Sequence, residues 1–129
     1  MLINGIERHF LLTVKAANVI AQFCPDNDFN KFAEITTGKT FSEIVDIDLK
    51  IAEILINEYE QNKAMEEAGY VPNLVKLNVE ELGSSITPFW IHNLELEMIQ
   101  TIRRDAFGQI DTEETKEAKK NKKNEAQAS

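Results

Sequence analysis

The alternation of hydrophobic and polar positions predicts a small hairpin at the N-terminus, followed by helices. Asn4-Gly5 lies between short apolar pieces, and this pair favours a two-residue turn because both central positions need positive φ. An apolar, strand-like piece follows at 10–13. From Val14 to Cys24, apolar residues recur three or four positions apart, which indicates a helix that Pro25 closes.

The strongest helical pattern runs from Phe41 to about Ala68. Thr40 and Glu43 form the box T-x-x-E that caps a helix start, and Gly69 and Pro72 end the helix. Apolar residues fall on two stripes, which predicts a helix that is covered on more than one side and lies at the centre of the fold. The two stripes are Ile44, Ile47, Ile51, Leu55 and Tyr59, and Val45, Leu49, Ala52 and Ile56.

Two shorter helices flank this central one. A short stripe at 29–35 precedes it, and Gly38 then breaks the chain. After it, Asn78 begins a capped segment, Asn78-Val79-Glu80-Glu81, and we expect Gly83 to end that helix.

The last long helix is predicted to begin with Thr87 as its N-cap and Pro88 at its first position, and to stop at Gly108. Its expected inner ladder is Trp90, Leu94, Met98, Ile102 and Ala106, with Ile91 and Ile99 beside it. The pattern as a whole predicts a mainly α fold: a single small helical domain over residues 1–110 with a short N-terminal β-hairpin.

The composition changes at Asp111. The segment 111–129 holds five acidic residues and five lysines, so it is neutral, and the whole net charge of −8 lies on residues 1–110. It contains no aliphatic or aromatic residue larger than alanine, so it cannot bury enough surface to offset its ordering entropy. We therefore expect a disordered, or at most transiently helical, C-terminal tail over 111–129.

Composition and charge exclude several classes of function. A chain of 129 residues fits one domain, and the single cysteine, Cys24, cannot form an internal disulfide. The net charge of −8 disfavours nucleic acid and anionic membranes as partners. The N-terminus lacks the pattern of a signal peptide, and no apolar run approaches the length of a membrane helix, so a cytoplasmic protein is the expectation.

Gly38-Lys39-Thr40 matches the end of a phosphate-binding loop and raises the question of nucleotide chemistry. The first glycine of that motif would fall at position 33, which is Ala33, and a buried strand should precede it, whereas the preceding segment is predicted to be helical. Thr40 and Glu43 are already explained as a helix cap. We predict that the chain binds no nucleotide.

Asp26, Asp28 and Asn30 imitate the start of a calcium-binding loop. Lys31 occupies the sixth position, where glycine makes the bend, and Thr37 occupies the twelfth, where a bidentate glutamate is needed. The alternative is a polar turn whose side chains cap the helix that follows. We expect the turn and no metal site.

Catalytic candidates are few. Cys24 follows Phe23 on an apolar face, where thiols are usually inert packing, and a Cys–His pair with His9 or His92 would need a stabilising group that the sequence does not indicate. The aromatic residues at helical spacing fit a core, with an exposed patch for a partner as the alternative. The acids that we expect on a solvated face are Glu80, Glu81, Glu95 and Glu97. We therefore predict no catalytic, cofactor-binding or metal-binding residues and no enzyme activity.

The order of several weak motifs carries a family resemblance over nearly the full length. The motifs are Ile3-Asn4-Gly5, the apolar piece 10–13, Ile20-Ala21-Gln22-Phe23-Cys24-Pro25, the segment 26–29, Ile54-Leu55-Ile56-Asn57-Glu58-Tyr59, Leu77-Asn78-Val79-Glu80-Glu81-Leu82 and the Glu/Thr-rich, then Lys-rich, segment 113–123. In this order they resemble the tail assembly chaperones of long-tailed bacteriophages and prophages of Gram-positive bacteria.

The resemblance implies a role without catalysis. Such proteins bind and solubilise the tape-measure protein, a very long helical chain with apolar stripes, in the host cytoplasm until tail-tube subunits polymerise around it. They are absent from the mature virion. The resemblance also allows the tail-tube protein as a second partner and self-association, and it carries over no residue-level binding site. A helical, acidic body suits a helical client, because apolar helix faces bind in grooves and net charge opposes aggregation.

Two other functions stay open at this point. One is a different small phage or bacterial adaptor, such as a tail-completion or head–tail joining factor, and the other is an enzyme that uses Cys24 or the acidic face. Neighbouring genes for a tube protein and a very large tape-measure protein would favour the chaperone, whereas activity lost on alkylating Cys24 would favour the enzyme.

The chaperone gene in many such phages also yields a longer, frameshifted product. Residues 119–124 read Lys-Lys-Asn-Lys-Lys-Asn, and every codon for these two residues begins AA, so this run can hold an A-rich slippery heptamer. The alternative is a charged tail that only aids solubility.

Overall fold

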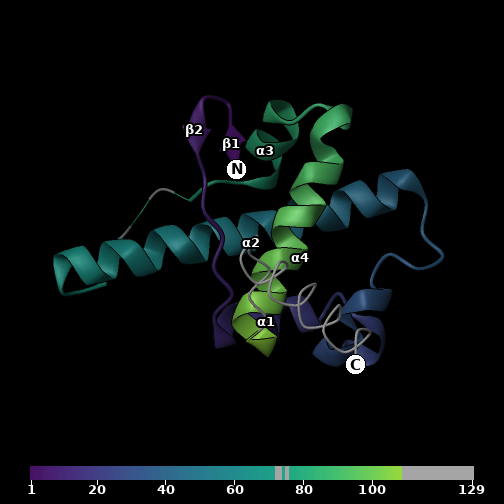
Figure 1. Cartoon of the computed structure of the whole chain (residues 1–129), viewed down its shortest axis with the longest axis horizontal. Coiled ribbons are helices and arrows are strands. Elements are labelled where there is room, and N and C mark those ends of the chain that lie inside the picture. The colour runs from purple at the N-terminus through teal and green to yellow at the C-terminus, as the bar shows by residue number, and fades with distance from the viewer. Residues whose placement is uncertain (72–73, 75, 109–129) are drawn as a thin grey trace, which may run out of the picture.

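The computed structural model describes residues 1–71, 74 and 76–108. Pro72, the tail predicted at 111–129 and the Lys/Asn run at 119–124 lie outside the described residues. Within them the fold is mainly α, with one small N-terminal hairpin, which confirms the predicted fold class. Figure 1 shows a long central helix that is crossed by a second long helix, with the hairpin and a short helix above the crossing.

The hairpin forms at the predicted turn. Strand β1 (Leu2–Ile3) pairs antiparallel with β2 (Ile6–Glu7), and Asn4 and Gly5 between them have φ values of 52° and 77°. These positive angles are the ones that a two-residue hairpin turn requires, and Asn-Gly tolerates them better than other pairs. The hairpin is anchored to the core by Ile3, which is buried.

The segment after the hairpin is not a strand. Residues 8–13 run without regular structure, and the backbone N–H of Leu11 donates to the carbonyl of Leu55 in the central helix at 3.1 Å. The prediction of a strand-like piece is wrong here because the neighbouring element is a helix, whose carbonyls cannot supply a strand ladder. Phe10 and Leu12 are nevertheless buried, as apolar residues beside a core should be.

Helix α1 (Val14–Ala21) begins where the sequence predicts but ends three residues early. Thr13 caps it, since its hydroxyl oxygen accepts the N–H of Ala16 at 3.0 Å. The chain then tightens into two 3₁₀ helices, η1 (Pro25–Asn27) and η2 (Phe29–Glu34). The predicted short stripe at 29–35 is therefore helical, in the tighter 3₁₀ form that short connectors often take.

Helix α2 (Phe41–Ala68) has the predicted bounds. Gly69 ends it in the left-handed conformation, with φ of 76°, and its N–H donates to the carbonyl of Met65 at 2.9 Å. Helices α1, α3 and α4 all pack against α2, which confirms its central position. Its C-terminal part projects away from the other helices (Figure 1). The buried side chains of α2 are Asp48, Leu49, Ile51, Ala52, Leu55 and Ile56.

The start of α2 is held by a reciprocal cap. The N–H of Glu43 donates to the hydroxyl oxygen of Thr40 at 3.3 Å, and the N–H of Thr40 donates to the Glu43 carboxylate at 3.2 Å. This hydrogen bond from the Thr40 backbone, followed by that from its hydroxyl, lowers the pKa of Glu43. The predicted capping box is therefore present.

Removing this cap gives a first stability prediction. We expect Thr40→Ala to lower the free energy of unfolding by about 1 kcal/mol, because the backbone N–H of Glu43 loses the hydroxyl oxygen to which it donates. Lys39→Ala is the matched control, since it alters a neighbouring exposed side chain and should change stability by less than about 0.5 kcal/mol. Urea denaturation of the two variants tests this, and equal effects would refute the assigned role of the cap.

Helix α3 (Val79–Ser85) starts at the predicted cap, where the side chain of Asn78 accepts the N–H of Glu81 at 2.8 Å. The prediction that Gly83 ends this helix is wrong. Gly83 lies inside the helix, where an added Cβ would sit 3.4 Å from the Cδ1 atom of Leu49. This is an ordinary van der Waals distance, so Gly83 lies next to the central helix without ending α3, which continues to Ser85.

The last helix is divided in two. Residues 88–90 form a 3₁₀ helix, η3 (Pro88–Trp90), and α4 (Ile91–Phe107) follows and ends at Gly108, which has φ of 66°. Thr87 precedes the turn but makes no side-chain cap. The predicted ladder is correct at Leu94, Met98 and Ile102, which are buried, and wrong at Trp90 and Ala106, which are exposed.

The error at Trp90 has a geometric cause. A 3₁₀ helix has three residues per turn, so Trp90 is rotated away from the ladder that a continuous α-helix would give it. Its indole is 51% exposed as a result. At the other end, Ala106 lies in the last turn before Gly108, beyond the buried residues of α4.

Candidate functional site

The clearest candidate site is an apolar groove between the hairpin and the start of α4. It has a volume of about 690 Å³. Polar residues, among them Asn93, Glu97 and Gln100, line it together with five apolar side chains, those of Met1, Leu2, Ile86, Trp90 and Leu96. We call Leu2, Ile86, Trp90 and Leu96 the hairpin groove. Leu2 is 66% exposed, Trp90 51% and Leu96 43%, so three of the four side chains face solvent over much of their surface.

Phe89 extends this apolar surface beyond the groove. Its ring is 80% exposed and meets the ring of Trp90 edge to face, with the centroids 5.3 Å apart. A cluster of large, exposed apolar side chains usually marks a binding site. Aromatic residues, and Trp above all, also contribute the most to protein–protein binding energy.

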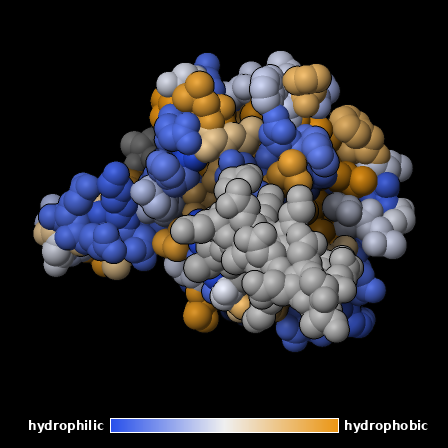
Figure 2. All heavy atoms as spheres, viewed as in Figure 1, coloured by the Kyte–Doolittle hydropathy of each residue, from blue (hydrophilic) through white to orange (hydrophobic). Residues whose placement is uncertain are grey.

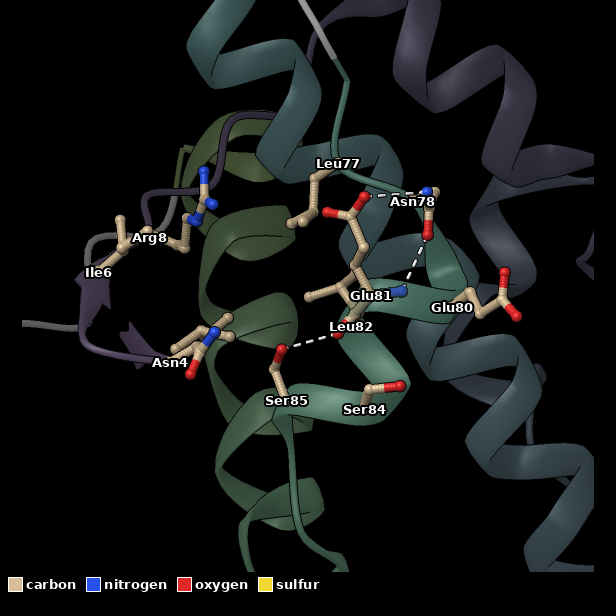
Figure 3. Close-up of a pocket in the computed structure, with 11 residues that line it drawn as sticks. Asn4, Ile6, Arg8, Leu77, Asn78, Glu80, Glu81, Leu82, Ser84 and Ser85 are labelled. Carbon is tan, nitrogen blue, oxygen red and sulfur yellow. Dashed lines mark hydrogen bonds between the residues drawn. The ribbon is translucent and has the colours of Figure 1, made fainter.

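A second pocket lies on the other side of the hairpin, against α3, and has a volume of about 680 Å³. Figure 3 shows Asn4, Ile6 and Arg8 on the hairpin side, facing Glu81 and Ser85 of α3. These side chains are mostly polar. Ile6 is 52% exposed, and Figure 2 shows apolar side chains gathered over the hairpin. The hairpin therefore presents apolar residues at its surface while polar groups line the α3 side.

The segment that resembles a phosphate-binding loop is a turn between helices. The 3₁₀ helix η2 stands where that motif has a strand, and Gly38 takes a positive φ of 75° in the turn that follows. Thr40 and Glu43 are engaged with each other in the cap of α2. The described residues therefore hold no strand–loop–helix at this place, which is the context that a phosphate loop needs.

The segment that resembles a calcium loop is the predicted polar turn. The carboxylate of Asp28 accepts the N–H of Asn30 at 3.0 Å and so caps η2, and Asp26 forms an ion pair with Lys31. Across residues 1–71, 74 and 76–108, no three His, Cys, Asp or Glu side chains lie together in an arrangement that could hold a metal ion.

Cys24 and the two histidines have separate contacts. The thiol of Cys24 is buried and donates to the carbonyl of Ile20 at 3.5 Å. Burial, followed by the charge of Asp28, raises the pKa of Cys24, which is the opposite of what a nucleophilic thiolate needs. His9 lies against the ring of Tyr59, with the centroids 4.9 Å apart, and His92 lies on the surface of α4.

The acidic residues divide into two groups. Glu80 and Glu81 are exposed, as expected for a solvated face, but Glu95 and Glu97 are half-buried, so the prediction is wrong for this second pair. Glu95 lies beside Asp48, a residue that the sequence analysis did not single out and that is only 3% exposed.

Burial, followed by a hydrogen bond and charge repulsion from Glu95, raises the pKa of Asp48 to about 8. A signal for this was available in the sequence. Asp48 stands between the two apolar stripes of α2, three residues from Val45 and three from Ile51, where a polar side chain must enter the core.

Comparisons with known proteins give no relative. No family model matches the chain, and neither the curated proteins nor the solved structures yield a match. Among the residues that the structure describes, no helix has the length and apolar character needed to cross a membrane.

Proposed function

We propose that this protein is a phage tail assembly chaperone that binds an apolar helical segment of the tape-measure protein and keeps it soluble in the host cytoplasm before tail assembly. The observation that carries the proposal is the hairpin groove, whose apolar side chains stay exposed beside a well-packed core. The order of the sequence motifs supplies the identity of the client.

The groove suits a helix as its client. An amphipathic helix places side chains at i, i+3 or i+4 and i+7 into an apolar groove, and a volume of about 690 Å³ leaves room for several such side chains. Trp90 provides a large, rigid anchor, and Leu2 and Leu96 add apolar surface to the same groove. The client buries its exposed apolar stripe against this surface, which removes the cause of its aggregation.

The charge of the protein supports the same role. It carries 22 acidic residues against 14 basic ones, a net charge of −8. A complex that holds an apolar client in such an acidic shell repels other copies of itself, which opposes aggregation.

Co-expression with the tape-measure protein of the same phage genome tests the proposal. We expect the tape-measure protein to be largely insoluble alone and to become soluble and co-purify when this chain is present. An equally insoluble tape-measure protein in both cultures would show that the chain is not its chaperone.

A matched pair of variants tests the groove itself. Leu96→Gln should weaken client binding about fivefold to thirtyfold, because replacing an apolar contact in a well-packed interface by a polar side chain costs about 1–2 kcal/mol. Val14→Gln is the control: Val14 is 90% exposed at the start of α1, and the change makes the same kind of apolar-to-polar substitution outside the groove. If both variants, or neither, lose the client, the groove is not where it binds.

A further inference from the structure

A third pocket, separate from the hairpin groove, lies where α2, α4 and η2 meet, and has a volume of about 440 Å³. Its walls are largely apolar, and Asp48 from α2 and Glu95 from α4 are among the residues that line it. The apolar side chains that define it are Phe32, Ile35, Ile51, Met98, Ile102 and Phe107. We call it the acid pocket.

Asp48 is the unusual group in this pocket. It is 3% exposed, and its Oδ2 atom has no hydrogen-bond partner within the described part of the chain. Buried carboxyl oxygens almost always have a partner, and an orphan at a pocket wall is a place where a ligand can supply one. The ionisable neighbour that acts on Asp48 is Glu95, which is also an acid. The basic group that faces this pair is His92, on the surface of α4, whose Nδ1 lies 3.9 Å from Oε2 of Glu95.

We propose that the acid pocket binds a primary alkylammonium group, such as a lysine side chain or a free aliphatic amine, with the ammonium between Asp48 and Glu95. An ammonium has three donors and no acceptor, so it can satisfy the carboxyl oxygens of both residues. Its methylene stem would lie along the apolar walls, as the stems of lysine side chains do. This proposal is independent of the client in the hairpin groove.

The charges around the pocket favour this placement. Arg103 also lines the pocket but lies roughly two turns further along α4 than Glu95, on the order of 12 Å at about 1.5 Å per residue. The residues that η2 contributes, among them Asn30 and Phe32, carry no charge. The acidic end of the pocket is therefore the end at which a cation is attracted.

Binding of a cation should release a proton. Burial, followed by contact with Glu95, raises the pKa of Asp48 to about 8, so its carboxyl is largely protonated at pH 7 in the empty pocket. An ammonium favours the ionised carboxylate, so the proton leaves Asp48 for solvent as the cation enters. The affinity for an amine should therefore rise by about tenfold per pH unit up to about pH 8, while the amine itself stays charged.

Titration of the full-length protein with n-pentylammonium tests the proposal. Calorimetry in two buffers of different ionisation enthalpy measures both affinity and proton release. We expect release of close to one proton at pH 7, a strong rise in affinity from pH 6 to pH 8, and only weak, pH-independent binding of the neutral analogue 1-pentanol.

Two variants locate the site. Asp48→Asn keeps the size of the side chain and should lower the affinity for n-pentylammonium at least tenfold and abolish its pH dependence. Asp46→Asn is the matched control, because Asp46 is an exposed acid on the same helix, and it should bind as the unmodified chain does. Circular dichroism checks the fold, and if Asp48→Asn does not fold, the half-buried Glu95→Gln takes its place with the same expectation.

The outcomes are distinct. Pentylammonium binding that is absent at millimolar concentration, independent of pH, or unchanged in both pocket variants overturns the proposal. Competition with 1,5-diaminopentane and with a blocked lysine peptide then identifies the source of the ammonium, since the tighter competitor is the class that the pocket accommodates. None of these results depends on tape-measure binding, which the co-expression experiment tests separately.

Discussion

Replacement of Leu94 by alanine is expected to lower the free energy of unfolding by about 3 kcal/mol. Leu94 is fully buried at 0% exposure on α4, the helix that crosses and packs against α2. Leucine-to-alanine changes at such positions cost about 2–5 kcal/mol, because the lost burial adds to the cost of the cavity. Small domains have only about 5–15 kcal/mol in total, so we expect a melting temperature lowered by at least about 10 °C.

Leu96 supplies the matched control on the same helix. It is 43% exposed in the hairpin groove, so Leu96→Ala should change stability by less than about 1 kcal/mol while weakening client binding. Urea denaturation of the two variants separates a core leucine from a surface one. Equal destabilisation by the two substitutions would mean that Leu94 is not buried between α4 and α2, or that Leu96 is not a surface residue of the groove.

The elements that could be predicted from the sequence are those fixed by local chemistry. Asn4-Gly5 specifies its own turn, because few other pairs tolerate two positive φ angles. The bounds of α2 follow from Thr40 at its start and Gly69 at its end, since each satisfies backbone groups within a few residues of itself. Such signals need no knowledge of the rest of the fold.

The errors arise where tertiary contact overrides a local signal. Glycine after a short helical run usually ends a helix, yet Gly83 lies inside α3, next to Leu49 of the central helix, and α3 continues to Ser85. Pro88 marks the start of a helix equally well for an α and a 3₁₀ geometry, and only the structure shows that η3 turns Trp90 outward. The outward turn of Trp90 is what makes it part of the hairpin groove.

Contacts between distant residues gave no sequence signal. The side chain of Asn57 in α2 donates to the carbonyl of Leu77 at 2.7 Å and accepts the N–H of the same residue at 2.9 Å. This pair of bonds imitates a strand partner and fixes the approach to α3. The pairing of Asp48 with Glu95 is of the same kind, because it depends on how α4 crosses α2. The hydrophobic pattern places such residues on a helix but does not identify the residues that they contact.

The buried carboxyl of Asp48 also has a consequence for stability. Its pKa is raised to about 8 in the folded protein by burial and then by Glu95, whereas an ordinary aspartate titrates near 3.8. Between these values the unfolded chain loses a proton that the folded chain keeps, and this favours unfolding as the pH rises. Below about pH 4 Asp48 is protonated in both the folded and the unfolded protein, so its burial does not lower the stability there.

Asp105 has the opposite effect on the pH dependence of stability, and this effect lies at lower pH. Burial opposes its ionisation, but hydrogen bonds from Arg104 and from the backbone N–H of Leu12 outweigh burial and lower its pKa. Its contribution to stability is therefore present above the ordinary aspartate pKa and is lost as the pH falls through its lowered value. Asp48 favours unfolding as the pH rises above the ordinary aspartate pKa, and Asp105 favours it as the pH falls below that value. The two residues together therefore predict maximal stability near that pKa, at about pH 4.

The free energy of unfolding is therefore expected to fall by about 2–4 kcal/mol between pH 5 and pH 8. Each unit of difference between folded and unfolded pKa is worth about 1.4 kcal/mol, and solvent near the half-buried Glu95 reduces the full effect.

Asp48→Asn should remove most of this dependence of stability on pH. The variant should also be more stable than the unmodified chain at pH 8, because a neutral amide of the same size replaces a buried carboxyl group whose ionisation is unfavourable in the folded protein. Asp46→Asn, on the exposed side of α2, should keep the slope. Urea denaturation of the three proteins at pH 5, 6.5 and 8 measures these differences, and an unchanged slope in Asp48→Asn would mean that Asp48 keeps an ordinary pKa in the folded protein.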